Sequence, residues 1–369
     1  MDSCDVLIIG GGPAGSTLAW KLRNRGLDVL ILDKSAFPRD KVCAGWITPA
    51  TTGLLQLNTD EYSRERVLQR ISGFKTSMIG TTEVLTRYGR TVSYGIRRCE
   101  FDHYLLQRAD ARLRLGEPLK TMERKKSVWI INDDVKTPLV IGAGGHFCPV
   151  SRFLRGKGER NGSAVIAQEV EFEMDESQQR HCRVAGEIPE LYFCDDLKGY
   201  GWCVRKGNFL NIGLGREGNM NVAEQVRSFF GYLRDKKTIP ANTPSNFRGH
   251  AYMLYHGASP TLVDDGVMLI GDAAGLAYPK SGEGIRPAVE SALTAADVIL
   301  SAAGDYRRGR LLQYPMLLAD RFGKGGTSPG ILILPQVVRH FMSHTLMKSR
   351  WFSRHVLLDR WFLNAHRPA

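Results

Sequence analysis

Long apolar runs and signal-like segments are absent from this sequence of 369 residues. No stretch reaches the about 18 consecutive apolar residues that a membrane-spanning helix needs. The N-terminal segment MDSCDVLIIGGG has no basic region and runs directly into glycines, unlike a secretory signal. These absences predict a cytoplasmic protein without a membrane span.

Cysteine is also sparse and shows no motif. The seven cysteines are scattered along the chain, their number is odd, and no CxxC pair occurs. A disulfide framework or a zinc site needs paired or closely spaced cysteines. We therefore expect reduced thiols and no metal site.

Positive charge is in excess, with 50 Lys and Arg against 38 Asp and Glu, and a net charge of +12. Such a balance attracts anions, and a dinucleotide, an acidic substrate or an anionic membrane surface all qualify. No recognisable nucleic-acid module accompanies the charge, so nucleic acid is not an expected partner.

The first 33 residues have the pattern of a βαβ unit. Residues 4–10 form an apolar run that predicts a buried strand, residues 13–26 predict a helix ending at Gly26, and residues 28–33 predict a second strand. Two strands joined by a helix in this way lie parallel, with a right-handed crossover.

The rest of the chain alternates between strand-rich and helical segments. Strands are expected within 71–98, 128–132, 138–142, 163–215 and 267–270, and helices over 99–110, 221–234 and 284–302. The predicted fold class is α/β, with a Rossmann-like nucleotide domain, an inserted antiparallel β-sheet substrate domain and a helical C-terminal tail. The predicted boundaries are 1–70, 95–160 and 255–307 for the nucleotide domain, 71–94 and 161–254 for the substrate domain, and 308–369 for the tail.

A glycine motif lies between the first predicted strand and helix. The segment Gly10-Gly11-Gly12-Pro13-Ala14-Gly15 fits G-x-G-x-x-G, in which glycines permit a tight turn, approach of a pyrophosphate and close helix packing. The helix N-terminus adds partial positive charge. Asp33 ends the second strand, where a carboxylate can accept hydrogen bonds from a ribose, and Lys34 follows it. These residues predict a dinucleotide site, and the motif alone does not separate FAD from NAD.

A second glycine-rich motif distinguishes between these cofactors. The segment GVMLIGDAAGLAYPKSGEGIRPAVES at 266–291 resembles the second FAD motif of the p-hydroxybenzoate hydroxylase fold, and most closely that of the geranylgeranyl reductase family. The resemblance implies that Asp272 contacts the ribityl chain. It also implies that N–H groups of the turn at 282–284 face the flavin N1–O2 edge, where a helix N-terminus stabilises negative charge. The cofactor-binding residues expected here are Gly271, Asp272, Pro279, Gly282, Gly284 and Ile285.

Three further segments resemble parts of this fold. Arg98 begins an R-x-x-F-D-x-x-L stretch, where the family's arginine lies beside the FAD. The segment 142–145, with Ser151 and Arg152 downstream, occupies the place of a G-A-D-G motif, but Gly144 replaces the aspartate, which puts fast use of NAD(P)H in doubt. The segment 39–46 resembles a K-x-C-G-G sequence that passes beside the flavin ring. It adds Cys43, Ala44 and Gly45 to the expected cofactor site.

The substrate side resembles the reductases at 200–215. Tyr200 and Trp202 are two residues apart and share one face of a strand, and together with Trp46 they are the expected substrate-pocket residues. Aromatic side chains in strands also pack without a ligand. Val204 and Arg205 stand where the family has Phe-Pro, so the substrate need not be a prenyl lipid. The W-x-W-x-I-P motif of flavin-dependent halogenases is missing.

Cys43 is the expected catalytic residue. Its thiol either orients substrate and relays a proton, or is only a small side chain beside the ring. Glu283 is more simply a solvated turn residue. His250 and His256 are more simply groups that satisfy local hydrogen bonds.

The tail from residue 331 contains six Lys or Arg residues and one acidic residue, mixed with apolar side chains. It predicts helices that cover the nucleotide domain or, alternatively, an amphipathic helix lying on an anionic bilayer. The second interpretation makes the protein membrane-peripheral.

The resemblance implies an FAD-dependent oxidoreductase of the geranylgeranyl reductase type that reduces C=C bonds of an apolar or lipid-like substrate; the expected partner is an apolar or aromatic small molecule. The electron donor is expected to be NAD(P)H or a ferredoxin-like protein, since no NAD(P)-specific domain is apparent. The alternatives are a flavin-dependent monooxygenase of an aromatic or peptidyl substrate, which the same fold supports, and an FAD-stabilised interaction protein without activity.

Overall fold

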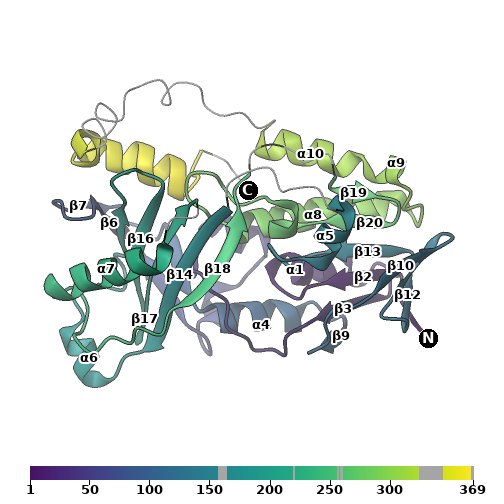
Figure 1. The fold of residues 1–369 in the computed structure, drawn as a ribbon, viewed down its shortest axis with the longest axis horizontal. Coiled ribbons are helices and arrows are strands. Elements are labelled where there is room, and N and C mark those ends of the chain that lie inside the picture. The colour runs from purple at the N-terminus through teal and green to yellow at the C-terminus, as the bar shows by residue number, and fades with distance from the viewer. Residues whose placement is uncertain (157–163, 219–220, 256, 258–260, 324–343, 367–369) are drawn as a thin grey trace. The chain divides into compact units, whose positions relative to one another are not determined.

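The computed structural model describes residues 1–156, 164–218, 221–255, 257, 261–323 and 344–366 (Figure 1). The chain divides into two compact units. Unit 1 consists of Met1–Asp40, Cys99–Gly162 and Tyr252–Thr327, and unit 2 consists of Lys41–Arg98, Ser163–Ala251 and Ser328–Ala369. No helix within the described ranges combines the length and apolar character needed to cross a bilayer.

The centre of unit 1 is a six-stranded sheet in the order β19-β20-β13-β2-β3-β9. Every pair in it is parallel except β19–β20. The residues of β2, β3, β13 and β20 are all buried, as expected for parallel strands covered on both faces. The predicted strands and the βαβ unit are confirmed. The strands are β2 (Val6–Ile9), β3 (Val29–Asp33), β9 (Arg112–Leu115), β13 (Leu139–Gly142), β19 (Val263–Asp264) and β20 (Val267–Leu269).

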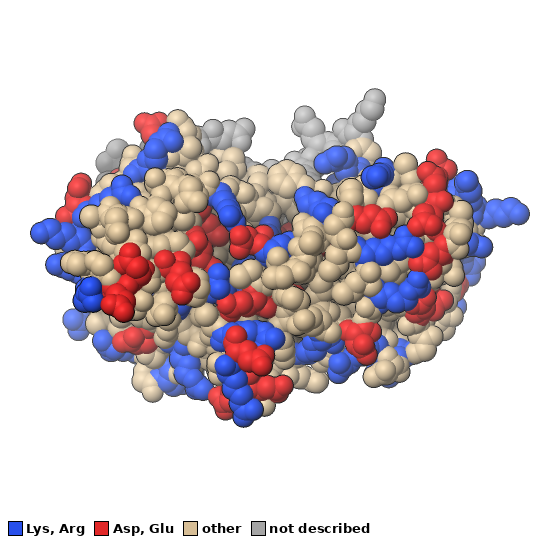
Figure 2. All heavy atoms as spheres, turned by 90° about the horizontal axis from the view of Figure 1, so that it is seen from below, with Lys and Arg blue, Asp and Glu red and all other residues tan. Residues whose placement is uncertain are grey.

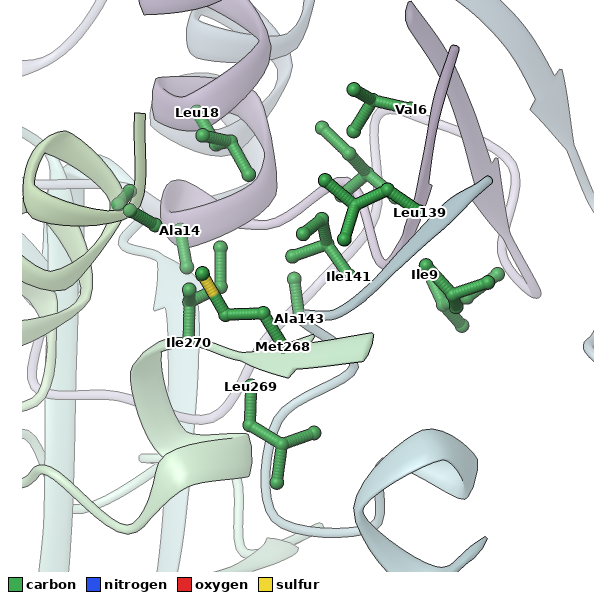
Figure 3. Packing of buried hydrophobic residues seen from close by; sticks show 14 of the residues in the cluster. Val6, Ile9, Ala14, Leu18, Leu139, Ile141, Ala143, Met268, Leu269 and Ile270 are labelled. Atoms are coloured by element: carbon green, nitrogen blue, oxygen red, sulfur yellow. The ribbon is translucent and has the colours of Figure 1, made fainter. Parts of the chain in front are cut away.

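Two helices, α1 (Pro13–Leu22) and α8 (Ile285–Ala302), lie side by side in unit 1 (Figure 1). Leu18 and Ala14 of α1 point toward sheet residues that include Ile141 and Met268 (Figure 3). α1 is shorter than predicted. After Leu22 the chain turns through Asn24 and Gly26, both with positive φ, so Gly26 belongs to the turn before β3 and not to the helix end.

The remaining elements of unit 1 surround this core. A small sheet in the order β1-β12-β11-β10 forms from Asp2–Ser3, Val135–Thr137, Val128–Ile131 and Met122–Lys125. The other helices are α4 (Arg98–Arg108), whose first residue falls in unit 2, α5 (Pro149–Arg155), the 3₁₀ helix η1 (Gly271–Ala274), α9 (Arg308–Leu311) and α10 (Gln313–Phe322).

Unit 2 is built on a seven-stranded sheet in the order β18-β14-β17-β16-β15-β6-β7. The pairs β14–β17, β17–β16, β16–β15 and β6–β7 are antiparallel, and β15–β6 is parallel. The inserted β-sheet domain that the sequence predicts is therefore present. Its strands are β6 (Gly73–Met78), β7 (Val84–Arg87), β14 (Ala164–Glu173), β15 (Glu190–Phe193), β16 (Gly199–Lys206), β17 (Phe209–Glu217) and β18 (Arg248–Met253).

Helix α7 (Val222–Asp235) covers one face of this sheet. Its Phe229 and Phe230 are buried in an apolar cluster with Leu210 and Ile212 of β17. The Phe229 ring lies so close to Gly201 that a Cβ there would come within 2.5 Å of it. Alternation along the strands therefore leaves the opposite face to Trp202, Lys206 and Asn211.

Residues 41–70 were predicted to belong to the nucleotide domain, but they lie in unit 2. The reason is pairing: β4 (Trp46–Ile47) and β5 (Leu68–Ile71) both pair with β8 (Ser93–Ile96) in a three-stranded sheet. The remaining helices of this unit are α2 (Pro49–Leu54), α3 (Thr59–Tyr62), α6 (Glu176–His181) and η2 (Phe352–Phe362), which has π-helical winding.

The predicted helical tail divides between the units. α9 and α10 belong to unit 1, whereas η2 packs within unit 2. Phe362 of η2 is fully buried, with its ring 5.7 Å from Trp46 and 5.1 Å from Tyr200. Asp359 accepts a hydrogen bond from the Tyr88 hydroxyl at 2.7 Å. The apolar side of η2 is thus used for packing inside unit 2.

We expect Phe362→Ala to lower the free energy of unfolding by about 3 kcal/mol, because it removes a buried ring from an aromatic cluster. Denaturant unfolding followed by fluorescence measures this. Trp351→Ala is the matched control, since Trp351 lies just before the same helix but is 66% exposed, and a change within about 0.5 kcal/mol is expected. Equal effects of the two substitutions would contradict the packing of η2.

Candidate functional site

The glycine loop at residues 10–15 joins β2 to α1 and leaves no room for a side chain at Gly10 or Gly15. Gly10 has φ +117°, and a Cβ on it would lie 2.5 Å from the Ala143 carbonyl oxygen. A Cβ on Gly15 would lie 1.9 Å from the Gly10 carbonyl oxygen. Gly12 is the N-cap of α1, with Pro13 and Ala14 in the first turn. The predicted strand–loop–helix context of the motif is present.

Asp33 holds this loop in place. Its carboxylate accepts hydrogen bonds from the Gly11 N–H at 2.7 Å and from the Ser35 N–H at 2.8 Å, and the residue is buried. The acidic residue at the end of β3 therefore has a structural contact with the loop, in addition to the ribose contact expected of it. Lys34, the next residue, is exposed.

Arg39 is a residue of this site that the sequence prediction missed. Its Nη2 atom lies 3.3 Å from the position that a Cβ of Gly12 would take. The guanidinium is held there by an ion pair with the buried Asp102 at 3.2 Å and by the face of the Phe37 ring. A fixed positive charge thus stands at the glycine loop, which is the place for a pyrophosphate.

The second glycine motif meets the first at Gly271. A Cβ on Gly271, where φ is +59°, would lie 3.0 Å from the Cβ of Ala14 in α1 and 3.4 Å from that of Ala288 in α8. The first turns of both helices therefore come together. Neither helix has a side-chain cap at its N-terminus. The first N–H groups of each helix have no partner within the helix, which is the setting in which helix N-termini bind anions.

The turn before α8 is shaped by Asp272 and Tyr252. A Cβ on Gly284 would lie 3.0 Å from Asp272 Oδ1, and a Cβ on Gly282, where φ is +69°, would lie 2.3 Å from the Tyr252 hydroxyl. The Tyr278 N–H donates to the Glu283 carbonyl at 2.9 Å and so closes the turn. Pro279 is exposed within it, and Ile285 is buried as the first residue of α8.

The segment 142–152 packs against the second motif. The Ser151 hydroxyl donates to the Ala273 carbonyl at 3.0 Å. Gly144 stands where the hydroxylases have aspartate, and a Cβ there would lie 3.3 Å from Cys148 Cα. Arg98, expected beside the FAD, is the buried first residue of α4.

These observations fit an FAD. The cradle at Gly10, Gly12 and Gly15 admits only backbone, so a pyrophosphate can approach it, and Arg39 faces the same loop. The N-terminus of α8, next to Asp272, suits the ribityl chain and the flavin edge that becomes negative on reduction.

Unit 2 holds the predicted catalytic cysteine in a tightly bonded turn. The Cys43 N–H donates to Glu169 Oε1 at 2.7 Å, and the Cys43 carbonyl accepts from the Asn211 amide at 3.2 Å. Gly45 has φ +66°, and a Cβ there would lie 2.3 Å from the Ile96 carbonyl oxygen and 2.4 Å from Lys206 Nζ. Ala44 lies half-buried between them. Side chains of the large sheet thus fix residues 43–45.

Two of the predicted pocket residues, Tyr200 and Trp202, lie on the same face of this sheet, whereas Trp46 belongs to β4 of the three-stranded sheet. The Trp202 indole N–H donates to Asn211 Oδ1 at 2.7 Å, and its ring lies across Gly213, where a Cβ would come within 2.4 Å of it. Tyr200 and Trp202 have ring centroids 6.0 Å apart. The Phe362 ring packs against both Tyr200 and Trp46, and so connects Trp46 to this pair. Gly213 therefore allows the indole to lie flat over β17.

A buried charge cluster underlies the Cys43 turn. Lys206, which is fully buried, forms an ion pair with Glu171 at 2.6 Å. Burial raises the pKa of Glu169 to about 7. Burial also opposes ionisation of Glu171, but the Lys206 charge holds the pKa of that carboxyl below its ordinary value. The sequence prediction missed both glutamates, since they lie more than 100 residues from the turn.

The remaining candidates have smaller roles in the geometry. His250 of β18 has its ring within 3.1 Å of Lys41 Nζ, and His256 lies outside the described residues.

No group of His, Cys, Asp and Glu suited to a metal ion occurs in the described part of the chain. On the face in Figure 2, basic and acidic side chains are interspersed.

The family described as "FAD binding domain" matches residues 3–110. A menaquinone reductase of Mycobacterium tuberculosis is 30% identical over 348 residues, which cover 88% of this chain and 82% of that protein. Digeranylgeranylglycerophospholipid reductase 3 of Methanosphaera stadtmanae is 28% identical over 350 residues, with 87% and 83% covered. The chain belongs to the geranylgeranyl reductase family of FAD-dependent oxidoreductases. This family membership confirms the predicted resemblance, the enzyme class and FAD as cofactor.

Solved structures agree with this family's fold. A geranylgeranyl bacteriochlorophyll reductase-like protein of Thermoplasma acidophilum superposes with a TM-score of 0.74 at 21% identity, over 94% of this chain and 88% of that one. PqsL of P. aeruginosa, in complex with 2-aminobenzoylacetate, superposes with a TM-score of 0.66 at 19% identity, over 87% and 92%. The predicted fold class is confirmed.

We expect Arg39→Ala to raise the Kd for FAD about tenfold, because a charge-assisted contact near the pyrophosphate is lost. Arg39→Lys should recover part of the affinity. Fluorescence titration of the apoprotein with FAD measures both. Arg25→Ala is the control, since Arg25 is an exposed arginine of the same unit. A Kd unchanged by Arg39→Ala would remove Arg39 from the cofactor site.

Proposed function

We propose that this enzyme reduces C=C bonds of an apolar or aromatic small molecule that is received by the aromatic face of unit 2. The observation that supports this most is that Tyr200 and Trp202 share one face of the large sheet, with the fixed Cys43 turn bonded to that sheet and Trp46 connected to Tyr200 through Phe362. The names of the relatives agree, since they refer to a menaquinone and to a geranylgeranyl phospholipid.

Unit 1 has the task of holding the cofactor. Gly10, Gly12 and Gly15 would give the pyrophosphate access to backbone N–H groups, Arg39 would balance its charge, and Asp272 with the N-terminus of α8 would hold the ribityl and flavin end. FAD bound there supplies hydride transfer. The remaining chemistry is positioning and proton supply by this chain's own residues.

Unit 2 has the task of orienting the substrate. Trp202 is locked by its hydrogen bond to Asn211 and by the space over Gly213, so its ring offers a fixed apolar surface. Tyr200 and Trp46 pack around the buried Phe362 ring and exclude water from this cluster. The Cys43 thiol accepts a hydrogen bond from the Gly45 N–H at 3.4 Å, which fixes its direction. We assign Cys43 to substrate orientation and proton relay.

The electron donor in this proposal is NAD(P)H binding transiently, or a ferredoxin-like protein. Gly144 in place of aspartate disfavours rapid use of a pyridine nucleotide, because the carboxylate of the hydroxylases has no counterpart there.

We expect the FAD-loaded enzyme, reduced with dithionite under anaerobic conditions, to be reoxidised by a geranylgeranyl lipid or by menaquinone, with a saturated bond in the product. Flavin absorbance near 450 nm and mass spectrometry of the product measure this. The fully saturated lipid is the control and should leave the flavin reduced; with menaquinone, whose quinone ring itself oxidises reduced flavin, the saturated C–C bond found by mass spectrometry is the deciding readout. Reoxidation only on admission of O2, with oxygen found in the product, would replace this proposal by monooxygenation.

We also propose that the outward side of the C-terminal region contacts an anionic bilayer. Trp351 is 66% exposed, Leu346 is 40% exposed, and the basic residues Lys348, Arg350 and Arg354 are exposed beside them. An exposed tryptophan among cations is typical of side chains at a membrane interface. The inward side of η2 remains packed in unit 2.

Trp351→Ala should lower the partition coefficient of the enzyme on phosphatidylglycerol vesicles about fivefold, because partial burial of its apolar ring at the interface contributes about 1 kcal/mol. Leu197→Ala is the matched control, since Leu197 is a 50% exposed apolar residue elsewhere in unit 2. Wild-type enzyme that does not sediment with these vesicles would exclude the membrane contact.

A further inference from the structure

Asn211 of β17 is a buried polar residue that the proposed reaction uses only as the hydrogen-bond partner of Trp202. Its exposed fraction is 1%. In the large sheet it is the register partner of Glu171 on β14, whereas Trp202 of β16 stands opposite Gly213, two residues further along β17. Asn211, Glu171 and Trp202 therefore lie on one face of the sheet, the face away from α7.

The side-chain amide of Asn211 contacts three groups. Its Oδ1 accepts the Trp202 indole N–H at 2.7 Å, and its Nδ2 donates to the Cys43 carbonyl and to Glu171 Oε2, both at 3.2 Å. An indole N–H only donates, whereas a carbonyl and a carboxylate only accept. Only one of the two amide orientations satisfies all three groups, with the oxygen toward Trp202 and the nitrogen toward Cys43.

A buried ion pair anchors the nitrogen side of this amide. The same Glu171 oxygen that accepts from Asn211 also accepts from Lys206 Nζ at 2.6 Å, and Lys206 is fully buried. Hydrogen bonds to ionised groups are the stronger ones in proteins. Rotation of the amide would leave the Trp202 N–H and the Cys43 carbonyl without this partner, which is costly for buried polar groups.

We propose that Asn211 is a positioning residue that connects the Trp202 ring to the Cys43 turn. One side chain then determines both where the apolar surface for the substrate lies and where the turn that carries the thiol is held. Asn211 acts through these two neighbours and does not itself touch the substrate. Its importance for turnover rests on the proposed function of Trp202 and Cys43.

Asn211→Asp separates the two contacts. Aspartate has nearly the same size and keeps an acceptor for the Trp202 indole, but it places an acceptor against the Cys43 carbonyl. In anaerobic reoxidation of the reduced flavin by a geranylgeranyl lipid, the limiting rate should fall about tenfold, because the thiol is displaced. The half-saturation concentration should stay within about twofold, because the Trp202 surface is kept. Asn208→Asp, at an exposed asparagine just before β17, is the control and should change neither value.

Amide hydrogen exchange of the FAD-loaded enzyme without substrate gives a second readout. In Asn211→Asp, the peptide spanning residues 43–47 should exchange at least about fivefold faster, because the turn has lost a hydrogen bond to the sheet. Trp202→Phe removes the indole N–H but leaves the Asn211 contact with Cys43, so exchange of this peptide should stay within about twofold. The α7 peptide on the other face of the sheet should be unchanged in both variants.

Three results would overturn the proposal. One is exchange at residues 43–47 that Asn211→Asp leaves as in wild type, and another is equal acceleration in this peptide and in α7, which marks general destabilisation. The third is acceleration at residues 43–47 in Trp202→Phe, which tests the connection even where Asn211→Asp does not fold. Failure of the enzyme to reduce any C=C bond would leave these exchange results unchanged, so the proposed function and the role of Asn211 fail separately.

Discussion

The close approach of α1 to α8 at Gly271 is the constraint on which the cofactor site depends. Ala14, Gly271 and Ala288 are small enough for the first turns of the two helices to meet above the ends of the parallel strands. A side chain at Gly271 would push the first turns of the two helices apart. Asp33, which accepts the Gly11 N–H, and Arg39, which lies beside Gly12, then contact a glycine loop whose position this packing has set.

The candidate cofactor site of unit 1 was largely predictable from the sequence because each of its glycine motifs lies within one short segment of the chain. Gly10, Gly12 and Gly15 lie within six residues, and the motif at 266–291 spans one strand, one turn and one helix. Backbone conformation at such places selects glycine directly, as the positive φ values at Gly10, Gly271 and Gly282 illustrate. Arg39 was missed because only its long side chain contacts the loop, and no local sequence pattern predicts where the end of such a side chain lies.

The candidate substrate site of unit 2 was less predictable because the residues that contact one another there are far apart in the sequence. Tyr200 and Trp202 were recognisable as neighbours on a strand, but Glu169 and Asn211 meet Cys43 across 126 and 168 residues. The placement of η2 was open for a similar reason. An amphipathic pattern says that one side of a helix is buried, and it does not say against which surface. Residues 41–70 likewise followed their strand partner β8 and not their neighbours in the chain.

The burial of Phe362 against Trp46 and Tyr200 has a consequence for synthesis of the chain. More than 300 residues separate Trp46 from the ring that covers it, so a ribosome must translate most of the protein before this cluster can close. Until then the nascent chain exposes aromatic side chains of unit 2, a state in which chaperones bind and aggregation competes with folding. Unit 1 needs no residue from the tail beyond α10 to form its parallel sheet. The nucleotide-binding unit can therefore fold during translation, whereas the aromatic face is completed only after residue 362 leaves the exit tunnel.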